Sequence, residues 1–124
     1  MEKIVKILSS KEEVLFAFLF GSAAKKKTSK LSDIDVGVYL DRSLSREEMI
    51  EKIVEISSEL DPNLKVDIVL LNEAPPSLAF EVIKGKPLLV RDKKALKEFV
   101  YMTLRRYHDR RYYDLRWAKA ILSR

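Results

Sequence analysis

Three aspartates are the residues whose type and spacing point most directly to chemistry. Two of them flank a single residue in the run Asp33-Ile34-Asp35, and the third, Asp67, lies in a later apolar run. Alternate side chains of a strand share one face, so Asp33 and Asp35 are expected to point the same way. Neighbouring carboxylates repel each other unless a cation lies between them, and Mg²⁺ prefers carboxylate and phosphate oxygens. The pattern therefore predicts a magnesium site.

Ten residues separate the dipeptide Gly21-Ser22 from the first of these aspartates. A glycine lets the backbone approach a phosphate closely, and backbone N–H groups with a serine hydroxyl can hold phosphate oxygens. If the strand of Asp67 lies beside the strand of Asp33 and Asp35, three carboxylates converge. Such a cluster can hold two metal ions that clamp the attacking and leaving oxygens of an in-line phosphoryl displacement. The residues together predict phosphoryl-transfer chemistry.

Alternating strands and helices are expected to position these residues. The continuous apolar run 14–20 is typical of a buried central strand, and Ser45 with Glu48 forms a capping box that opens a helix. The expected strands are 14–20, 33–40, 65–71 and 87–90, and the expected helices are 2–13, 45–60, 77–84 and 93–122. We expect a single α/β domain over 1–124, with a core at 1–92, a mixed sheet of three to four strands with flanking helices, and a long C-terminal helix within an extension at 93–124.

The composition narrows the class of protein. A length of 124 residues is that of one domain, and the absence of cysteine excludes disulfides and thiolate-bound zinc. No apolar run is long enough to span a membrane and the first residues do not open a signal peptide, which predicts a cytoplasmic protein. Abundant lysine and glutamate without any glutamine is typical of a protein from a thermophile.

Positive charge and aromatic residues collect in the last quarter of the chain. Residues 1–92 hold 14 basic and 16 acidic residues, a sum of −2, whereas residues 93–124 hold 10 basic and 3 acidic residues, a sum of +7. A helix of about 30 residues would span ~45 Å, which is longer than a small sheet can cover. We therefore expect part of this tail to contact another protein, and the alternative is a solvated basic helix face.

Gly-Ser, ten residues, Asp-x-Asp and a later lone aspartate resemble the signature of the nucleotidyltransferase superfamily of DNA polymerase β. The stretch Gly21-Ser22-Ala23-Ala24 with Ser32-Asp33-Ile34-Asp35 is most similar to its minimal members, the MNT proteins. These include the MntA-type antitoxins that pair with HEPN-domain toxins. The resemblance covers roughly residues 1–92 and implies the polymerase β-like nucleotidyltransferase fold.

The resemblance also implies roles for particular residues. Asp33 and Asp35 would bind Mg²⁺, Asp67 would complete a site for two ions and act as the base, and Gly21 with Ser22 would contact the phosphates of ATP. Two weaker candidates are Lys25, as a phosphate ligand, and Ser32, which would fix the aspartate loop; either could be an ordinary loop residue. The chain departs from many MNT members in having Lys25-Lys26 in place of Arg-Gly, which keeps charge but not the guanidinium fork.

The acceptor of the nucleotide is expected to be a protein. Nucleic-acid polymerases and antibiotic-modifying members of the superfamily are longer, so direct nucleic-acid binding is not expected. The resemblance implies AMP transfer to a tyrosine of a HEPN toxin. Two alternatives remain open, a nucleotide-binding antitoxin that acts by binding alone and the catalytic subunit of a split small-molecule transferase. His108, the sole histidine, lacks an arginine at the spacing of HEPN ribonucleases, so the chain is not expected to be the toxin itself.

Overall fold

A four-stranded mixed sheet organises the chain. The computed structural model describes residues 1–21 and 34–106. The strand order is β3-β2-β1-β4, in which β1 pairs antiparallel with β2 and β4, and β2 pairs parallel with β3. The strands are β1 (Val14–Phe20), β2 (Ile34–Leu40), β3 (Val66–Leu70) and β4 (Lys86–Val90). The predicted mixed sheet is confirmed, and the most apolar run forms a strand with a partner on each side.

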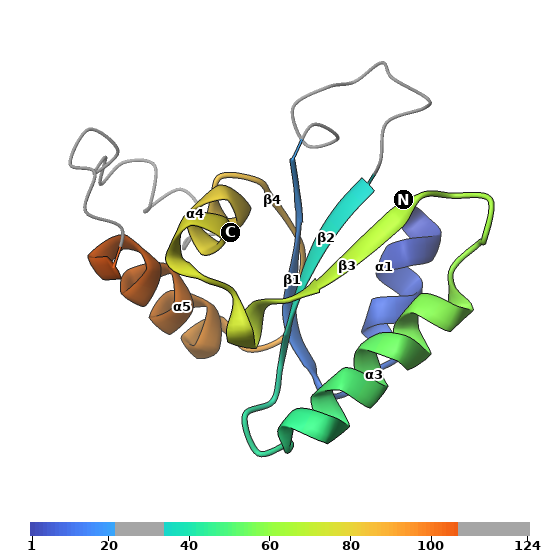
Figure 1. The fold of residues 1–124 in the computed structure, drawn as a ribbon, viewed down its shortest axis with the longest axis horizontal. Helices are drawn as coiled ribbons and strands as arrows, with labels where there is room; N and C mark the ends of the chain where they lie inside the picture. Colours follow the sequence, from blue (N-terminus) through green and yellow to red (C-terminus); the bar gives the residue numbers. More distant parts are fainter. Residues whose placement is uncertain (22–33, 107–124) are drawn as a thin grey trace.

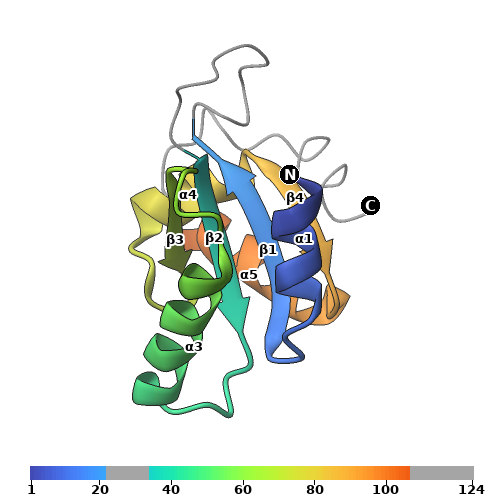
Figure 2. The same ribbon diagram turned by 90° about the vertical axis from the view of Figure 1, so that its right-hand side faces the viewer.

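Helices cover both faces of this sheet. Figure 1 shows α4 and α5 on one side of the strands and α1 and α3 on the other, and Figure 2 shows α1 and α3 in front of the strands. One face carries α1 (Glu2–Ser9) and α3 (Arg46–Glu59), and the other carries α4 (Pro76–Ile83), α5 (Lys93–Arg106) and the short 3-10 helix η1 (Leu71–Glu73). None of the described helices is long and apolar enough to cross a membrane.

The side chains of β1 alternate between two cores. Ala17 and Leu19 join the core under α1 and α3, whereas the three phenylalanines at 16, 18 and 20 join the core under α4 and α5. Val36 and Val38 of β2 lie in the first core, as the sequence predicts. By alternation, Asp35, Gly37 and Tyr39 therefore face the side of the sheet that carries α4 and α5.

Helix ends follow their local side-chain chemistry. The predicted capping box is confirmed, because Glu48 N donates to Ser45 Oγ (3.1 Å) and Ser45 N donates to Glu48 Oε1 (2.7 Å). The first helix was expected to reach residue 13 but ends at Ser9. The Ser9 and Ser10 hydroxyls donate to backbone carbonyl oxygens of the last turn, at 2.8 and 2.6 Å, which favours termination there.

The first half of the predicted C-terminal helix belongs to the folded domain. Helix α5 begins after Asp92, whose Oδ1 accepts a hydrogen bond from Ala95 N at 3.0 Å. Leu96 and Val100 are buried in the second core, and Leu104 packs against its edge. The core thus extends beyond residue 92. The expected remainder of the helix, with His108 and most of the tail aromatics, lies outside the described residues.

Candidate functional site

Three strands meet at the end of the sheet where β1 finishes and where β2 and β3 start. The register pairs Phe20 of β1 with Asp35 of β2, and Asp35 with Asp67 of β3. Directly paired residues of neighbouring strands point to the same face, and such strands lie about 4.8 Å apart. The strand of Asp67 therefore does lie beside that of Asp35, which is the condition for their carboxylates to converge.

Gly21 makes room for one of these carboxylates. It follows β1 directly and has a φ of 77°, a left-handed conformation that glycine adopts without strain. A Cβ at this position would collide with Asp35 Oδ2. The sequence predicts that this glycine lets the backbone approach a phosphate, and in the structure the turn also clears the aspartate. The conformation favours glycine here, and any larger residue would have to shift the Asp35 carboxylate.

Leu71 bounds the site along the sheet. It is buried in the core under α4 and α5, and a Cβ at Gly37 would lie 2.7 Å from Leu71 Cδ2. Gly37 is two residues beyond Asp35 and shares its face, so Leu71 covers the strand immediately past the carboxylate. Asp35 is half-buried and Asp67 is exposed. Within the described residues, the acidic pair consequently lies beyond Leu71, at the end of the face where the chain leaves β1.

The donor set of this pair fits a magnesium ion. Strand pairing aligns the two aspartates, Asp35 and Asp67, on one face. Magnesium binds through one or two carboxylates together with substrate phosphates, so Asp35 and Asp67 supply the expected oxygen donors. No group of three potential metal ligands occurs among the described residues, a set that does not include Asp33.

The other predicted site residues cannot be placed in this geometry because they lie outside the described residues. They are Ser22, Lys25, Ser32 and Asp33. Their assigned contacts with metal and phosphate stay predictions, as does the second metal ion. The described residues that flank that segment are Gly21 and Ile34. Both of them lie beside the acidic pair.

Asn72 positions the site and was missed by sequence reasoning. Its Oδ1 accepts from Leu40 N at 2.8 Å and its Nδ2 donates to Leu40 O at 2.9 Å. The Asn72 side chain thus satisfies the backbone N–H and C=O of the last residue of β2, as a neighbouring strand would. Strand β3 ends at Leu70, one residue earlier than expected. The Asn72 hydrogen bonds fix η1, and with it Leu71, over the sheet. The available signal was an amide at the end of an apolar run in a chain with only two asparagines.

A comparison with protein families agrees with this geometry. The family model described as "Polymerase beta, Nucleotidyltransferase" matches residues 2–94, more than half of the chain. The chain belongs to this nucleotidyltransferase family. The matched range includes Gly21, Asp35 and Asp67, and also the segment with Ser22 and Asp33. No curated protein matches the chain in a corresponding search.

Solved structures with a similar fold come from toxin–antitoxin complexes. A chain of a toxin–antitoxin crystal structure with AMP-PNP is 26% identical, with a TM-score of 0.65 over 84% of this chain and 83% of that chain. Chains of the MntA–HepT toxin–antitoxin and of a tri-AMPylated Shewanella oneidensis HEPN toxin in complex with an MNT antitoxin are each 25% identical. Both have a TM-score of 0.59 over 84% of this chain and 80% of theirs. The predicted polymerase β-like nucleotidyltransferase fold is confirmed.

Proposed function

We propose that this chain is a Mg²⁺-dependent antitoxin of the MNT type that transfers AMP from ATP to a tyrosine hydroxyl of a partner HEPN toxin. The observation that carries the proposal is the register of Asp35 with Asp67 beside the Gly21 turn, in a chain of the nucleotidyltransferase family. Aligned carboxylates offer the oxygen donors through which a divalent cation is held together with the phosphates of a nucleotide.

The nucleotide is proposed to bind at the end of β1. Asp33 and Asp35 hold the magnesium-bound triphosphate, and Gly21 with Ser22 contacts phosphate oxygens through backbone N–H groups and a hydroxyl. Lys25 adds a cationic contact to the phosphates, and Ser32 fixes the loop that leads into Asp33. Bound Mg²⁺ supplies electrostatic stabilisation of charge on the phosphate oxygens. The binding of AMP-PNP in a structurally similar toxin–antitoxin supports a nucleoside triphosphate as the substrate.

Asp67 is proposed to act on the acceptor. Its side chain is exposed, so a hydroxyl presented by another protein can reach it. The hydroxyl oxygen attacks the α-phosphorus, the bond from that phosphorus to the bridging oxygen breaks, and pyrophosphate leaves. The hydroxyl proton passes to the Asp67 carboxylate as the new P–O bond forms. A base on the neighbouring strand can act without displacing Asp35 from the nucleotide.

The identity of the acceptor is supported by the structural relatives. One of them is a tri-AMPylated HEPN toxin in complex with an MNT antitoxin, and the matched chain is 25% identical to this one. A HEPN protein that is encoded next to this chain is accordingly the proposed acceptor, with the two proteins forming a hetero-oligomer.

Isotope position in ATP tests the proposed reaction. The chain is incubated with Mg²⁺, the HEPN protein and ATP labelled at either the α- or the γ-phosphate. Transfer of AMP predicts protein-bound label from α-labelled ATP only, and none when Asp35→Asn replaces the unaltered chain. Tight association without label would instead identify an antitoxin that acts by binding. Label on a small molecule in place of the protein would identify a split small-molecule transferase.

A further inference from the structure

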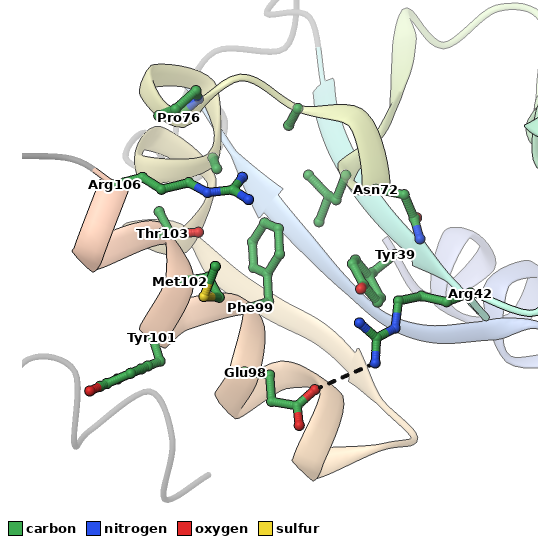
Figure 3. A pocket seen from close by; sticks show the side chains of 13 residues that line it. Tyr39, Arg42, Asn72, Pro76, Glu98, Phe99, Tyr101, Met102, Thr103 and Arg106 are labelled. Atoms are coloured by element: carbon green, nitrogen blue, oxygen red, sulfur yellow. Dashed lines mark ion pairs between the residues drawn. The ribbon is translucent and has the colours of Figure 1, made fainter.

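A groove lies on the same face of the sheet as the acidic pair. It has a volume of about 580 Å³ and lies between helix α5 and the segment that joins η1 to α4. Figure 3 shows Phe99 and Arg106 reaching into it from α5, opposite Tyr39 and Asn72. Neither Asp35 nor Asp67 lines the groove.

The groove has an aromatic wall that is formed before anything binds. The Tyr39 ring stacks on Phe16, with centroids 4.8 Å apart and planes 7° from parallel. The centroid of the Phe99 ring lies 5.6 Å from that of Tyr39. Partial burial raises the pKa of the Tyr39 phenol, so it stays neutral at physiological pH. Asn72 is held by its two hydrogen bonds to Leu40. A ligand would therefore meet an ordered surface, which lowers the entropic cost of binding.

The rim of the groove combines cations with exposed apolar surface. Met102 lines it and is 42% exposed, and the adjoining Tyr101 is 63% exposed. Arg106 makes no salt bridge within the described part of the chain, and Arg42 makes only a long, exposed contact with Glu98 at 3.9 Å. Helix α5 as a whole carries five basic residues and one acidic residue. This rim is complementary to an acidic surface with an apolar side chain at its centre.

Leu71 separates the groove from the acidic pair. Tyr39 lies four residues beyond Asp35 on the same strand, a distance of about 13 Å at 3.3 Å per residue. Gly37 and the Leu71 side chain that packs over it lie between them. A triphosphate bound at Asp35 thus leaves the groove free, while a protein seated in the groove extends within reach of Asp67.

We infer that this groove is the docking site for the acceptor protein. The segment that it takes presents one aromatic or aliphatic side chain against Tyr39 and Phe99, with carboxylates that pair with Arg42 and Arg106. The identification of that protein as the HEPN acceptor rests on the proposed function; the docking surface itself is defined by the groove. Partner carboxylates displace the weak Arg42–Glu98 contact at little cost, because exposed ion pairs of this length contribute little.

A double variant that adds negative charge to the rim, called the rim variant, tests the inference by titration calorimetry with the HEPN protein. Met102→Glu combined with Arg106→Glu is expected to weaken the complex at least tenfold, because one change places a charge against an apolar contact and the other opposes the partner's carboxylates. The matched control is Val54→Glu on α3, where the valine is 61% exposed on the other side of the sheet. The control should bind the HEPN protein normally, and both variants should bind ATP with unchanged affinity.

The outcomes separate docking from catalysis. If the unaltered chain binds the HEPN protein and the rim variant does not, docking holds even when no label is transferred, in which case only the proposed reaction fails. Equal binding by the rim variant, weakened binding by Val54→Glu, or no binding by the unaltered chain would each overturn the docking site. Because the chain has no cysteine, Met102→Cys can carry a single photo-crosslinker. Crosslinks to the HEPN protein are expected, whereas crosslinks confined to a second copy of this chain would overturn the inference.

Discussion

The two faces of the sheet differ in how they use charge. On the face with α1 and α3, ion pairs tie elements together: Lys11 contacts Glu55 at 2.7 Å and Glu59 at 2.5 Å, and Lys52 contacts Glu13 at 3.5 Å. On the face with α4 and α5, the two aspartates are paired in neighbouring strands at the end of the sheet, and arginines stand at the rim of a groove. The charges named on the first face stabilise its own structure, whereas we propose that those named on the second face bind ligands.

The cores under the two faces also differ in the kind of side chain that forms them. The core under α1 and α3 is aliphatic and includes Ile4, Leu8 and Ile56, all fully buried or nearly so. The core under α4 and α5 is rich in phenylalanine, and the aromatic side chains at its edge, Tyr39 and Phe99, are only partly buried. Substitutions that leave each core intact should therefore affect stability on the first face and ligand binding on the second.

The largest effect is expected from Asp35→Asn. Removing one carboxylate of the aligned pair removes charge that holds the nucleotide and stabilises the transition state. We expect AMP transfer to fall by at least about a hundredfold. The matched control is Glu51→Gln, an exposed carboxylate of α3. Labelled product is quantified for both variants at equal concentration, and equal activity would show that the faces do not differ as described.

Asp67→Asn should separate turnover from binding. Loss of a general base lowers the transfer rate by about 10²- to 10⁴-fold, whereas the main contacts to the triphosphate remain. Measured by single-turnover kinetics and by ATP titration, the variant is expected to bind nucleotide and to transfer it slowly. Near-normal turnover would mean that Asp67 has no catalytic role, and Asp61 and Glu73 would then need to be tested.

Gly21→Ala should lower both the stability of the fold and the affinity for ATP. An alanine at a φ of 77° costs about 1–2 kcal/mol of folding free energy, and its Cβ would also push against Asp35. A lower melting temperature together with weaker ATP binding is expected. Gly37→Ala gives the contrast, because its Cβ meets Leu71 and not the carboxylate. If Gly21→Ala bound ATP normally, the turn would not control the position of Asp35.

The smallest effect is expected on the other face, from Glu55→Gln. Hydrogen bonds from Lys11 and then Lys52 lower the pKa of Glu55 below its ordinary value of 4.5. A carboxyl with a lowered folded-state pKa stabilises the protein above pH 4.5, and that contribution disappears as the pH falls through the lowered value. The variant should melt a few degrees lower at pH 7, this difference should shrink as the pH falls below 4.5, and transfer activity should be unchanged. A loss of transfer activity in this variant would contradict the described difference between the two faces.

Sequence patterns predicted this fold well because its signals are local. The apolar run of β1 and the Ser45 capping box each specify one element, and the alternation in β2 assigns Asp35 to a face. The adjacency of Asp35 and Asp67 could be predicted only conditionally, since strand order depends on how all the layers pack. The Asn72 contact, the collision that forbids a side chain at Gly21 and the groove beside α5 could not be predicted. They arise between residues that are far apart in the sequence.

The dependence of ATP binding on Mg²⁺ tests the central claim most directly, namely that Asp33 and Asp35 hold the nucleotide through a metal ion. Titration calorimetry with a non-hydrolysable ATP analogue is run with and without Mg²⁺ on the unaltered chain and on the Asp33→Asn, Asp35→Asn double variant. The account predicts that Mg²⁺ strengthens binding to the unaltered chain and has no such effect on the variant. Equal affinity with and without Mg²⁺ in the unaltered chain would contradict it.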